Sequence, residues 1–233
     1  MKALAPTPRA YRPVLLVALG ALVALAALPA SDAGAVSPNV VISQAYGGGG
    51  NAGSTWKNDF IELLNTGVTS VDVTGWSVQY AAATGTTWIV TPLVGVLAPG
   101  QYLLIQQATG GGGTAALPTP EIIGTTAMSA TAGKVALVND AVALSGTCPA
   151  GLKIVDLLGY GATANCAEAA VTAAPNATTA VQRLSNGCTD RDNNLIDFTV
   201  VTPQPRNSAY PRNECQVVPT SPETWGRIKS FYR

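Results

Sequence analysis

Short apolar runs separated by turn residues dominate the hydrophobic pattern from residue 40 onward. Within residues 76–80, large side chains alternate with polar ones, so Trp76, Val78 and Tyr80 should share a buried face. Runs of this length, bounded by Gly, Pro and Asn, predict an all-β domain rather than a helical bundle. The expected strands are residues 40–45, 60–65, 76–80, 87–90, 102–107, 135–139, 154–160 and 180–184.

Two long connections, residues 108–131 and 162–178, lack a strand pattern, and connections of that length are commonly functional or mobile. A shorter one, residues 48–53, formally satisfies the dinucleotide-binding pattern G-x-G-x-x-G. That pattern binds a dinucleotide only where it opens a helix within a βαβ unit. Here it joins two strand-like segments, so we expect a flexible loop.

Four motifs in this pattern resemble the lamin tail domain family. The sequence VVISQ at residues 40–44 is similar to the family's V-x-I-S-E strand, with Gln44 in place of the usual Glu. Residues 59–65, 73–76 and 97–102 follow its D-x-[IV]-E-L-x-N, L-x-G-W and L-x-P-G-x-x motifs. The likeness covers residues 40–207 and implies an immunoglobulin-like β-sandwich.

The motif residues are expected to be structural. Asp59 and Glu62 are three positions apart on a strand, so their side chains point to opposite faces and do not converge on one substrate. The resemblance supports a structural Glu62 that bonds neighbouring backbone groups. It implies structural roles for the family-motif residues Asp59, Glu62, Asn65, Gly75 and Trp76.

The first 35 residues have the layout of a secretory signal peptide. Lys2, Arg9 and Arg12 precede an apolar stretch at residues 14–28, and residues 33–35 supply small side chains for cleavage. The alternative is a retained membrane anchor, because the stretch is nearly long enough to cross a bilayer. We expect cleavage, no transmembrane helix afterwards, and a location outside the cell or at its surface. The predicted parts are a signal peptide (1–35), a sandwich (36–216) and a C-terminal segment (217–233).

The net charge and the absence of histidine exclude several classes of function. Residues 36–233 hold 13 − 3 = 10 basic and 13 − 1 = 12 acidic residues, so their net charge is −2. A weakly acidic surface repels phosphate backbones, so nucleic acid is not an expected partner. The chain has no histidine, which excludes Ser-His-Asp triads, Cys-His dyads and His-ligated metals. We therefore expect no enzyme.

Four cysteines fall in the part expected to be exported, where an even number favours disulfides. Three pairings can be formed. We favour Cys148–Cys166 and Cys188–Cys215, because each closes a modest loop. The cysteine spacing does not suit zinc.

One acidic segment, residues 190–197, is a candidate calcium site, and no other cofactor is expected. Oxygen-bearing side chains recur there, as calcium prefers. The segment is not an EF-hand, because Leu195 replaces the turn glycine and Val201 stands where the bidentate Glu belongs. The alternative is a chain of Asx turns that stabilises the loop. The candidate ligands are Asp190, Asp192, Asn194 and Asp197.

The last residues differ in composition from the sandwich. They combine aromatic and basic side chains, of which Trp225, Arg227, Lys229 and Arg233 are candidate docking residues. The segment is either a terminal address that contacts an anionic surface or a short helix packed on the sandwich. Asn176 begins a formal glycosylation sequon.

These observations favour an exported, non-catalytic interaction or adhesion module whose partner is an unidentified surface protein or polymer. The resemblance implies the same kind of role, since lamin tail domains occur alone or attached to secreted nucleases and other hydrolases as binding parts. The alternative is an accessory or nucleic-acid-binding subunit of a separately encoded secreted nuclease or hydrolase. A carboxylate-dependent hydrolase has the least support.

Overall fold

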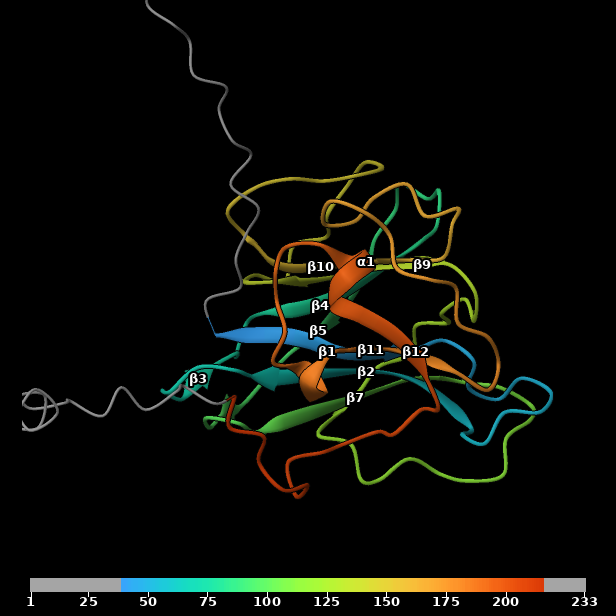
Figure 1. Cartoon of the computed structure of the whole chain (residues 1–233), viewed down its shortest axis with the longest axis horizontal. Coiled ribbons are helices and arrows are strands. Elements are labelled where there is room, and N and C mark those ends of the chain that lie inside the picture. Colours follow the sequence, from blue (N-terminus) through green and yellow to red (C-terminus); the bar gives the residue numbers. More distant parts are fainter. Residues whose placement is uncertain (1–38, 216–233) are drawn as a thin grey trace, which may run out of the picture. The chain divides into compact units, whose positions relative to one another are not determined.

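The computed structural model describes residues 39–215, which fall within one compact unit. Nearly all its regular structure is strand (Figure 1). The strands of this part are β1 Val40–Tyr46, β2 Asn58–Asn65, β3 Val71–Asp72, β4 Ser77–Ala82, β5 Ile89–Pro92, β6 Val96–Leu97, β7 Tyr102–Thr109, β8 Ile122–Ile123, β9 Gly133–Val138, β10 Ile154–Tyr160, β11 Ala180–Arg183 and β12 Phe198–Val201. A 3₁₀ turn, η1 (Ser185–Gly187), and a one-turn helix, α1 (Asn194–Asp197), lie between β11 and β12.

Two sheets face each other and form the predicted β-sandwich (Figure 1). The larger sheet has the order β12-β11-β1-β2-β7-β8, and the smaller has the order β10-β9-β4-β5. All pairs are antiparallel except β7 with β8. Side chains from both sheets, among them Ile42, Leu63, Val78 and Leu137, form the main core between them.

All eight predicted strands are present, with ends shifted by two residues or fewer. The sequence pattern missed β3, β6 and β8, because two residues cannot show a period, and it also missed β12. β8 divides the connection at residues 108–131, where we expected no strand. Val78 and Tyr80 are buried as predicted, and the partly buried Trp76 packs against the same core.

The outer face of the smaller sheet is also covered, which the alternation in β4 did not predict. Ser77 and Gln79 are fully buried. The Ser77 hydroxyl donates to the Asp140 carbonyl, and Gln79 bonds the backbone of Val142 and Leu144. Loop residues after β9 therefore satisfy polar side chains that an open sheet would present to water.

The glycine-rich connection after β1 is closely packed. A Cβ on Gly49 would lie 1.9 Å from the Asn58 carbonyl carbon, and one on Gly50 would lie 2.2 Å from the Gly110 Cα. Gly50 also has a φ of +69°, which favours glycine. These glycines allow two backbone segments to approach, and their role is structural.

Two disulfides, Cys148–Cys166 and Cys188–Cys215, join the cysteines in the pairing that we favoured. They close loops with sequence separations of 18 and 27 residues. Each contributes roughly 2–4 kcal/mol to stability by restricting the unfolded chain.

The expected signal peptide (1–35) and C-terminal segment (217–233) lie outside the described residues. Between residues 39 and 215, no helix is long and apolar enough to span a membrane.

Candidate metal centre

A buried arginine links the two sheets beside the acidic segment. Arg183, at the end of β11, donates from Nη2 to both carboxylate oxygens of Asp156 on β10, at 2.8 Å each. Its Nε donates to the Ile42 carbonyl, and its guanidinium lies 4.5 Å from the Phe198 ring centroid. A bidentate pair of this kind fixes the relative position of β10 and β11.

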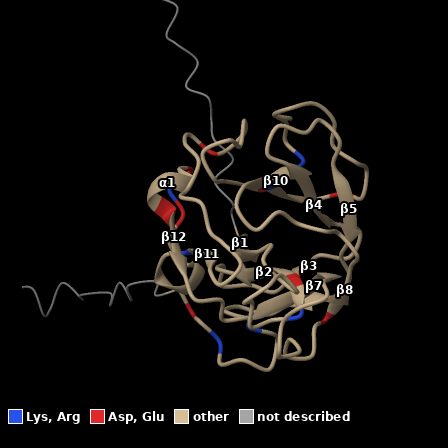
Figure 2. Ribbon diagram, turned by 90° about the vertical axis from the view of Figure 1, so that its right-hand side faces the viewer, with Lys and Arg blue, Asp and Glu red and all other residues tan. Residues whose placement is uncertain are grey.

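The acidic segment folds around the same arginine. Arg183 Nη1 donates to Asp190 Oδ1 at 2.9 Å and lies 3.7 Å from Asp197 Oδ2. Asp197 Oδ2 also accepts the backbone N–H groups of Arg191 and Asn193. The segment therefore curls back over α1, and acidic residues lie at α1 and in the chain next to it (Figure 2).

Three carboxylate oxygens in this segment have no hydrogen-bond partner although they are buried. They are Asp190 Oδ2, Asp192 Oδ1 and Asp197 Oδ1. The Asp197 side chain is 0% exposed. Buried polar atoms without a partner are rare in folded proteins, so three in one segment call for an explanation.

Glu168, from the connection after β10, adds a fourth carboxylate. One oxygen from each of Glu168, Asp190 and Asp192 lies within 4.8 Å of the others. Burial, followed by the negative charge of Asp156, raises the pKa of Glu168 from 4.5 to about 9. Burial, followed by the charges of Asp190 and Asp197, also raises the pKa of Asp192. Burial and the neighbouring carboxylates thus favour the protonated, neutral forms of Glu168 and Asp192.

Asn194 does not offer a free oxygen. Its Oδ1 accepts the N–H groups of Gly159 and Glu168, and its Nδ2 donates to the Leu157 carbonyl and to Glu168 Oε2. Asn194 therefore holds the Glu168 segment against β10. Of the four predicted ligands, the structure places Asp190 and Asp192 in one group with Glu168. It places Asp197 next to the same Arg183 as Asp190 and gives Asn194 a positioning role.

Sequence reasoning missed Glu168, Asp156 and Arg183. Asp156 and Arg183 each stand alone in an otherwise buried strand, and an isolated charge in such a strand is a usable signal of a buried pair. Glu168 lies 22 residues before Asp190 in an irregular connection, and no local spacing points to it. The Asx-turn interpretation is partly realised, because Asn193 caps α1 by accepting from the Leu195 N–H.

The family-motif carboxylates form a different kind of cluster. Glu62 is fully buried and accepts from the side chain and the N–H of Arg206, with Nη2 to Oε1 at 2.6 Å. Ser43 Oγ also donates to Glu62 Oε1. Arg206 Nη1 donates to the Tyr102 hydroxyl, and burial raises the pKa of Tyr102 to about 12. The main partner of Glu62 is thus a distant side chain, not the neighbouring backbone that we expected.

The other motif residues also serve the fold. Asp59 accepts the N–H groups of Gly49 and Met128 and shares no hydrogen-bond partner with Glu62, so the two motif carboxylates serve different contacts. Asn65 Nδ2 donates to the Thr69 and Leu97 carbonyls. Gly75 has a φ of +86° in the turn where the Trp76 N–H donates to the Val73 carbonyl.

Asn176, the sequon residue, is exposed in the turn before β11. Its Oδ1 accepts from both the N–H and the hydroxyl of Thr178.

Comparisons with known proteins give a family and no functional assignment. None of the curated proteins matches the chain. A solved structure of a DUF4876 family protein from Bacteroides thetaiotaomicron has 13% identity and a TM-score of 0.47, with 72% of each chain covered. The family that describes the Lamin Tail Domain matches residues 33–162, which is more than half of the 233 residues. The chain belongs to the Lamin Tail Domain family.

Proposed function

We propose that this chain is an exported, non-catalytic interaction module that binds a surface protein or polymer at or beyond the cell surface. The observation that carries the proposal is that the polar side chains of the family motifs bond other groups of the same chain. Glu62 is neutralised by Arg206, and Asp59 and Asn65 bond the backbone. The family motif thus supports a scaffold, and contact with a partner falls to the exposed loops and strand edges.

Two observations support the exported location. The disulfides Cys148–Cys166 and Cys188–Cys215 form and persist in oxidising compartments. The layout of residues 1–35 is that of a signal peptide. An oxidising environment would also keep both bridges closed at the site of binding.

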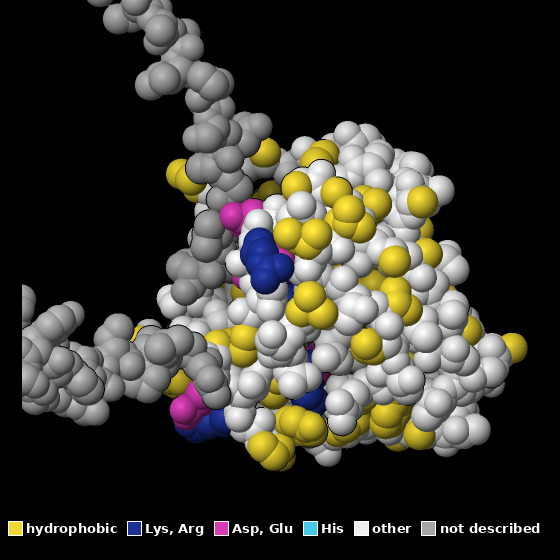
Figure 3. All heavy atoms as spheres, in the orientation of Figure 1, with side chains coloured by type: hydrophobic (Ala, Val, Ile, Leu, Met, Phe, Trp, Pro, Cys, Tyr) yellow, Lys and Arg dark blue, Asp and Glu magenta, His cyan; other side chains and the backbone are white. Residues whose placement is uncertain are grey.

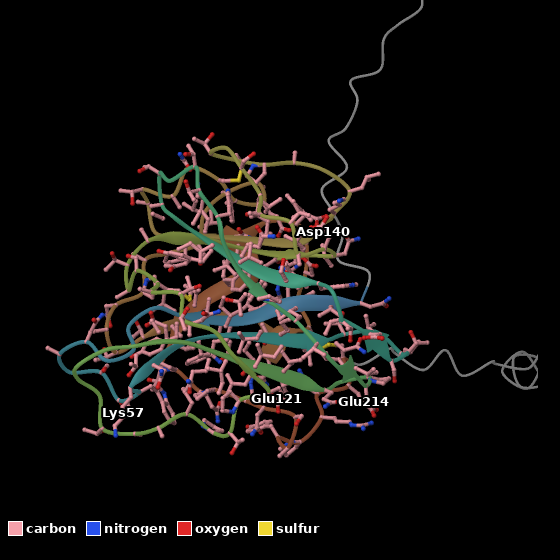
Figure 4. All side chains as sticks on the ribbon, turned by 180° about the vertical axis from the view of Figure 1, so that it is seen from behind. Lys57, Glu121, Asp140 and Glu214 are labelled. Atoms are coloured by element: carbon pink, nitrogen blue, oxygen red, sulfur yellow. A yellow bond between two sulfur atoms is a disulfide. The ribbon has the colours of Figure 1, made fainter. Side chains whose placement is uncertain are left out.

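The distribution of charge argues against nucleic acid as the partner. Residues 39–215 contain seven Lys and Arg residues, of which Lys134, Arg183 and Arg206 are buried. The exposed four, Lys57, Lys153, Arg191 and Arg212, come from distant parts of the chain, and Lys153 pairs with Asp140. Lys57 and Asp140 lie far apart in Figure 4, and charged side chains are few on the face in Figure 3. A nucleic-acid-binding surface needs a basic stripe. A nucleic-acid-binding subunit of a secreted nuclease therefore has less support.

Binding and turnover assays on the purified full chain test this proposal. We expect capture by a surface polymer or protein fraction of the source cells, no retention on duplex DNA at about 0.15 M salt, and no hydrolysis of DNA, esters or glycosides. Reduced and unfolded chain is the control for specific capture. Hydrolysis that disappears in a folded Glu62→Gln or Asp59→Asn variant would overturn the assignment.

A further inference from the structure

We propose that the acidic segment and the connection after β10 form a calcium site whose ligands are Glu168, Asp190, Asp192 and Asp197. This ligand set replaces Asn194 of the sequence-based prediction with Glu168. The site is separate from the proposed interaction function, so either can fail without the other.

The first argument is the set of buried oxygens without partners. Asp197 has no exposed side-chain surface, yet its Oδ1 accepts no hydrogen bond. Asp190 Oδ2 and Asp192 Oδ1 are also buried and also accept no hydrogen bond. An isolated loop of Asx turns would leave these oxygens unsatisfied, whereas a cation bound at this segment would supply a partner that the described residues do not.

The second argument is the balance of charge. Arg183 is the buried cation of this cluster in the described structure, and its Nη2 is committed to Asp156. Its Nη1 bonds one oxygen of Asp190. Arg183 Nη1 also lies 3.7 Å from Asp197 Oδ2, so Asp156, Asp190 and Asp197 share one guanidinium. Asp192 and Glu168 form no ion pair among the described residues. Buried charges in proteins are normally paired or bind metals.

The third argument is the ligand chemistry and the spacing. The donors are all carboxylate oxygens, which suit a hard cation. Oxygens bound to one ion lie at most twice the metal–oxygen distance apart, which is about 4.6–5.2 Å for calcium and about 4.0–4.2 Å for magnesium. The oxygens of Glu168, Asp190 and Asp192 lie within 4.8 Å of one another, which one calcium ion can span. A set made only of protein carboxylates favours calcium, because magnesium usually keeps several waters.

The site would join three segments that are distant in sequence. Glu168 comes from the connection after β10, Asp190 and Asp192 come from the loop after β11, and Asp197 comes from α1. An ion bound to all three would fix this end of the sandwich beside the Arg183–Asp156 pair. Calcium would then stabilise the folded chain by mass action.

Metal analysis and thermal unfolding of the full chain test the site. After equilibrium dialysis against calcium, we expect about one bound ion per chain. At a calcium concentration about 100-fold above the dissociation constant, the melting temperature should rise by roughly 5–10 °C relative to chelator. Magnesium at the same concentration should give a smaller rise.

The Asp192→Asn variant separates a ligand from a loop-stabilising residue. Asn tolerates the left-handed backbone at this position, where φ is +53°, and no hydrogen bond accepted by the Asp192 carboxylate occurs among the described residues. In chelator, the variant should melt at or above the wild-type temperature, because a repelled charge is gone. In calcium, it should lose most of the wild-type rise. Asp72→Asn, at an exposed site on β3, is the matched control and should keep the full response.

Several outcomes would overturn the site. These are no bound calcium, an equal rise with magnesium, or a full calcium response in Asp192→Asn. If Asp192→Asn melts below the wild type in chelator and still responds to calcium, Asp192 only stabilises the loop and the Asx-turn interpretation holds. Should Asp192→Asn fail to fold, Glu168→Gln is the second variant, and the metal content of the wild type decides the question without any variant.

Discussion

This sandwich has two buried carboxylate clusters, one at Glu62 and one around Arg183. They contain similar groups, but only the first has enough positive charge and hydrogen-bond donors for its carboxylate oxygens. At Glu62, one carboxylate meets one guanidinium, and both of its oxygens accept hydrogen bonds. Around Arg183, one guanidinium faces the carboxylates of Asp156, Asp190 and Asp197, and three buried oxygens accept nothing. Burial alone therefore does not distinguish a structural ion pair from a candidate binding site, whereas the balance of charges and hydrogen bonds does.

The largest expected effect comes from breaking the balanced cluster. Arg206→Met leaves Glu62 buried without its counter-charge, which should lower the free energy of unfolding by about 3–5 kcal/mol. Urea denaturation measures the loss. Arg212→Met, at an exposed arginine, is the control and should have little effect. A loss below about 1 kcal/mol would mean that the Glu62–Arg206 pair does not hold the fold.

The disulfide between the two clusters should have the next largest effect. Cys188 precedes the acidic segment by two residues, and Cys215 follows Arg206 by nine. Replacing both with Ser should cost about 3.5 kcal/mol, because the bridge closes a loop with a sequence separation of 27. Denaturation under non-reducing conditions measures this cost. Thiol titration of the unfolded, unreduced wild type should find no free sulfhydryl, and a reactive thiol would contradict the pairing.

Asp59 is an intermediate case, because it accepts hydrogen bonds but forms no ion pair within residues 39–215. Burial raises its pKa from 3.8 to about 6. Below pH 3.8 both states are protonated and the contribution of Asp59 to stability is complete. As the pH rises from 3.8 through about 6, the unfolded chain ionises first and this contribution is lost, by roughly 3 kcal/mol.

Comparison with Asp59→Asn isolates this effect from other groups. The stability of the wild type relative to the variant, measured by urea denaturation from pH 3 to pH 8, should fall across that window and level off above it. A difference that rises with pH would show that ionised Asp59 is the stabilised form.

The smallest effect should come from a charge pair on the surface. Lys153 and Asp140 form a salt bridge in which the Lys153 side chain is 69% exposed. Lys153→Met should leave the denaturation midpoint unchanged within error, because water and salt screen such pairs. A shift comparable with that of Arg206→Met would mean that loss of charge in general, and not burial, controls stability.

The sequence by itself determined the fold class and most of the strands. Apolar runs and turn residues are local signals, and the four motifs between residues 40 and 102 predicted the lamin tail sandwich that the structure has. Of the three possible cysteine pairings, short loops favoured the one that the structure has. The short strands β3, β6 and β8 could not be predicted, because their pairing depends on neighbours that the sandwich supplies.

Only the tertiary structure decided the roles of the charged residues. Glu62 and Arg206 are 144 positions apart, and Glu168 meets Asp190 and Asp192 only because β10 and β11 lie in facing sheets. The oxygen pattern of residues 190–197 indicated a candidate site but placed Asn194 among the ligands. Whether a side-chain oxygen is free to bind depends on every group that packs against it, and that information is not local in the sequence.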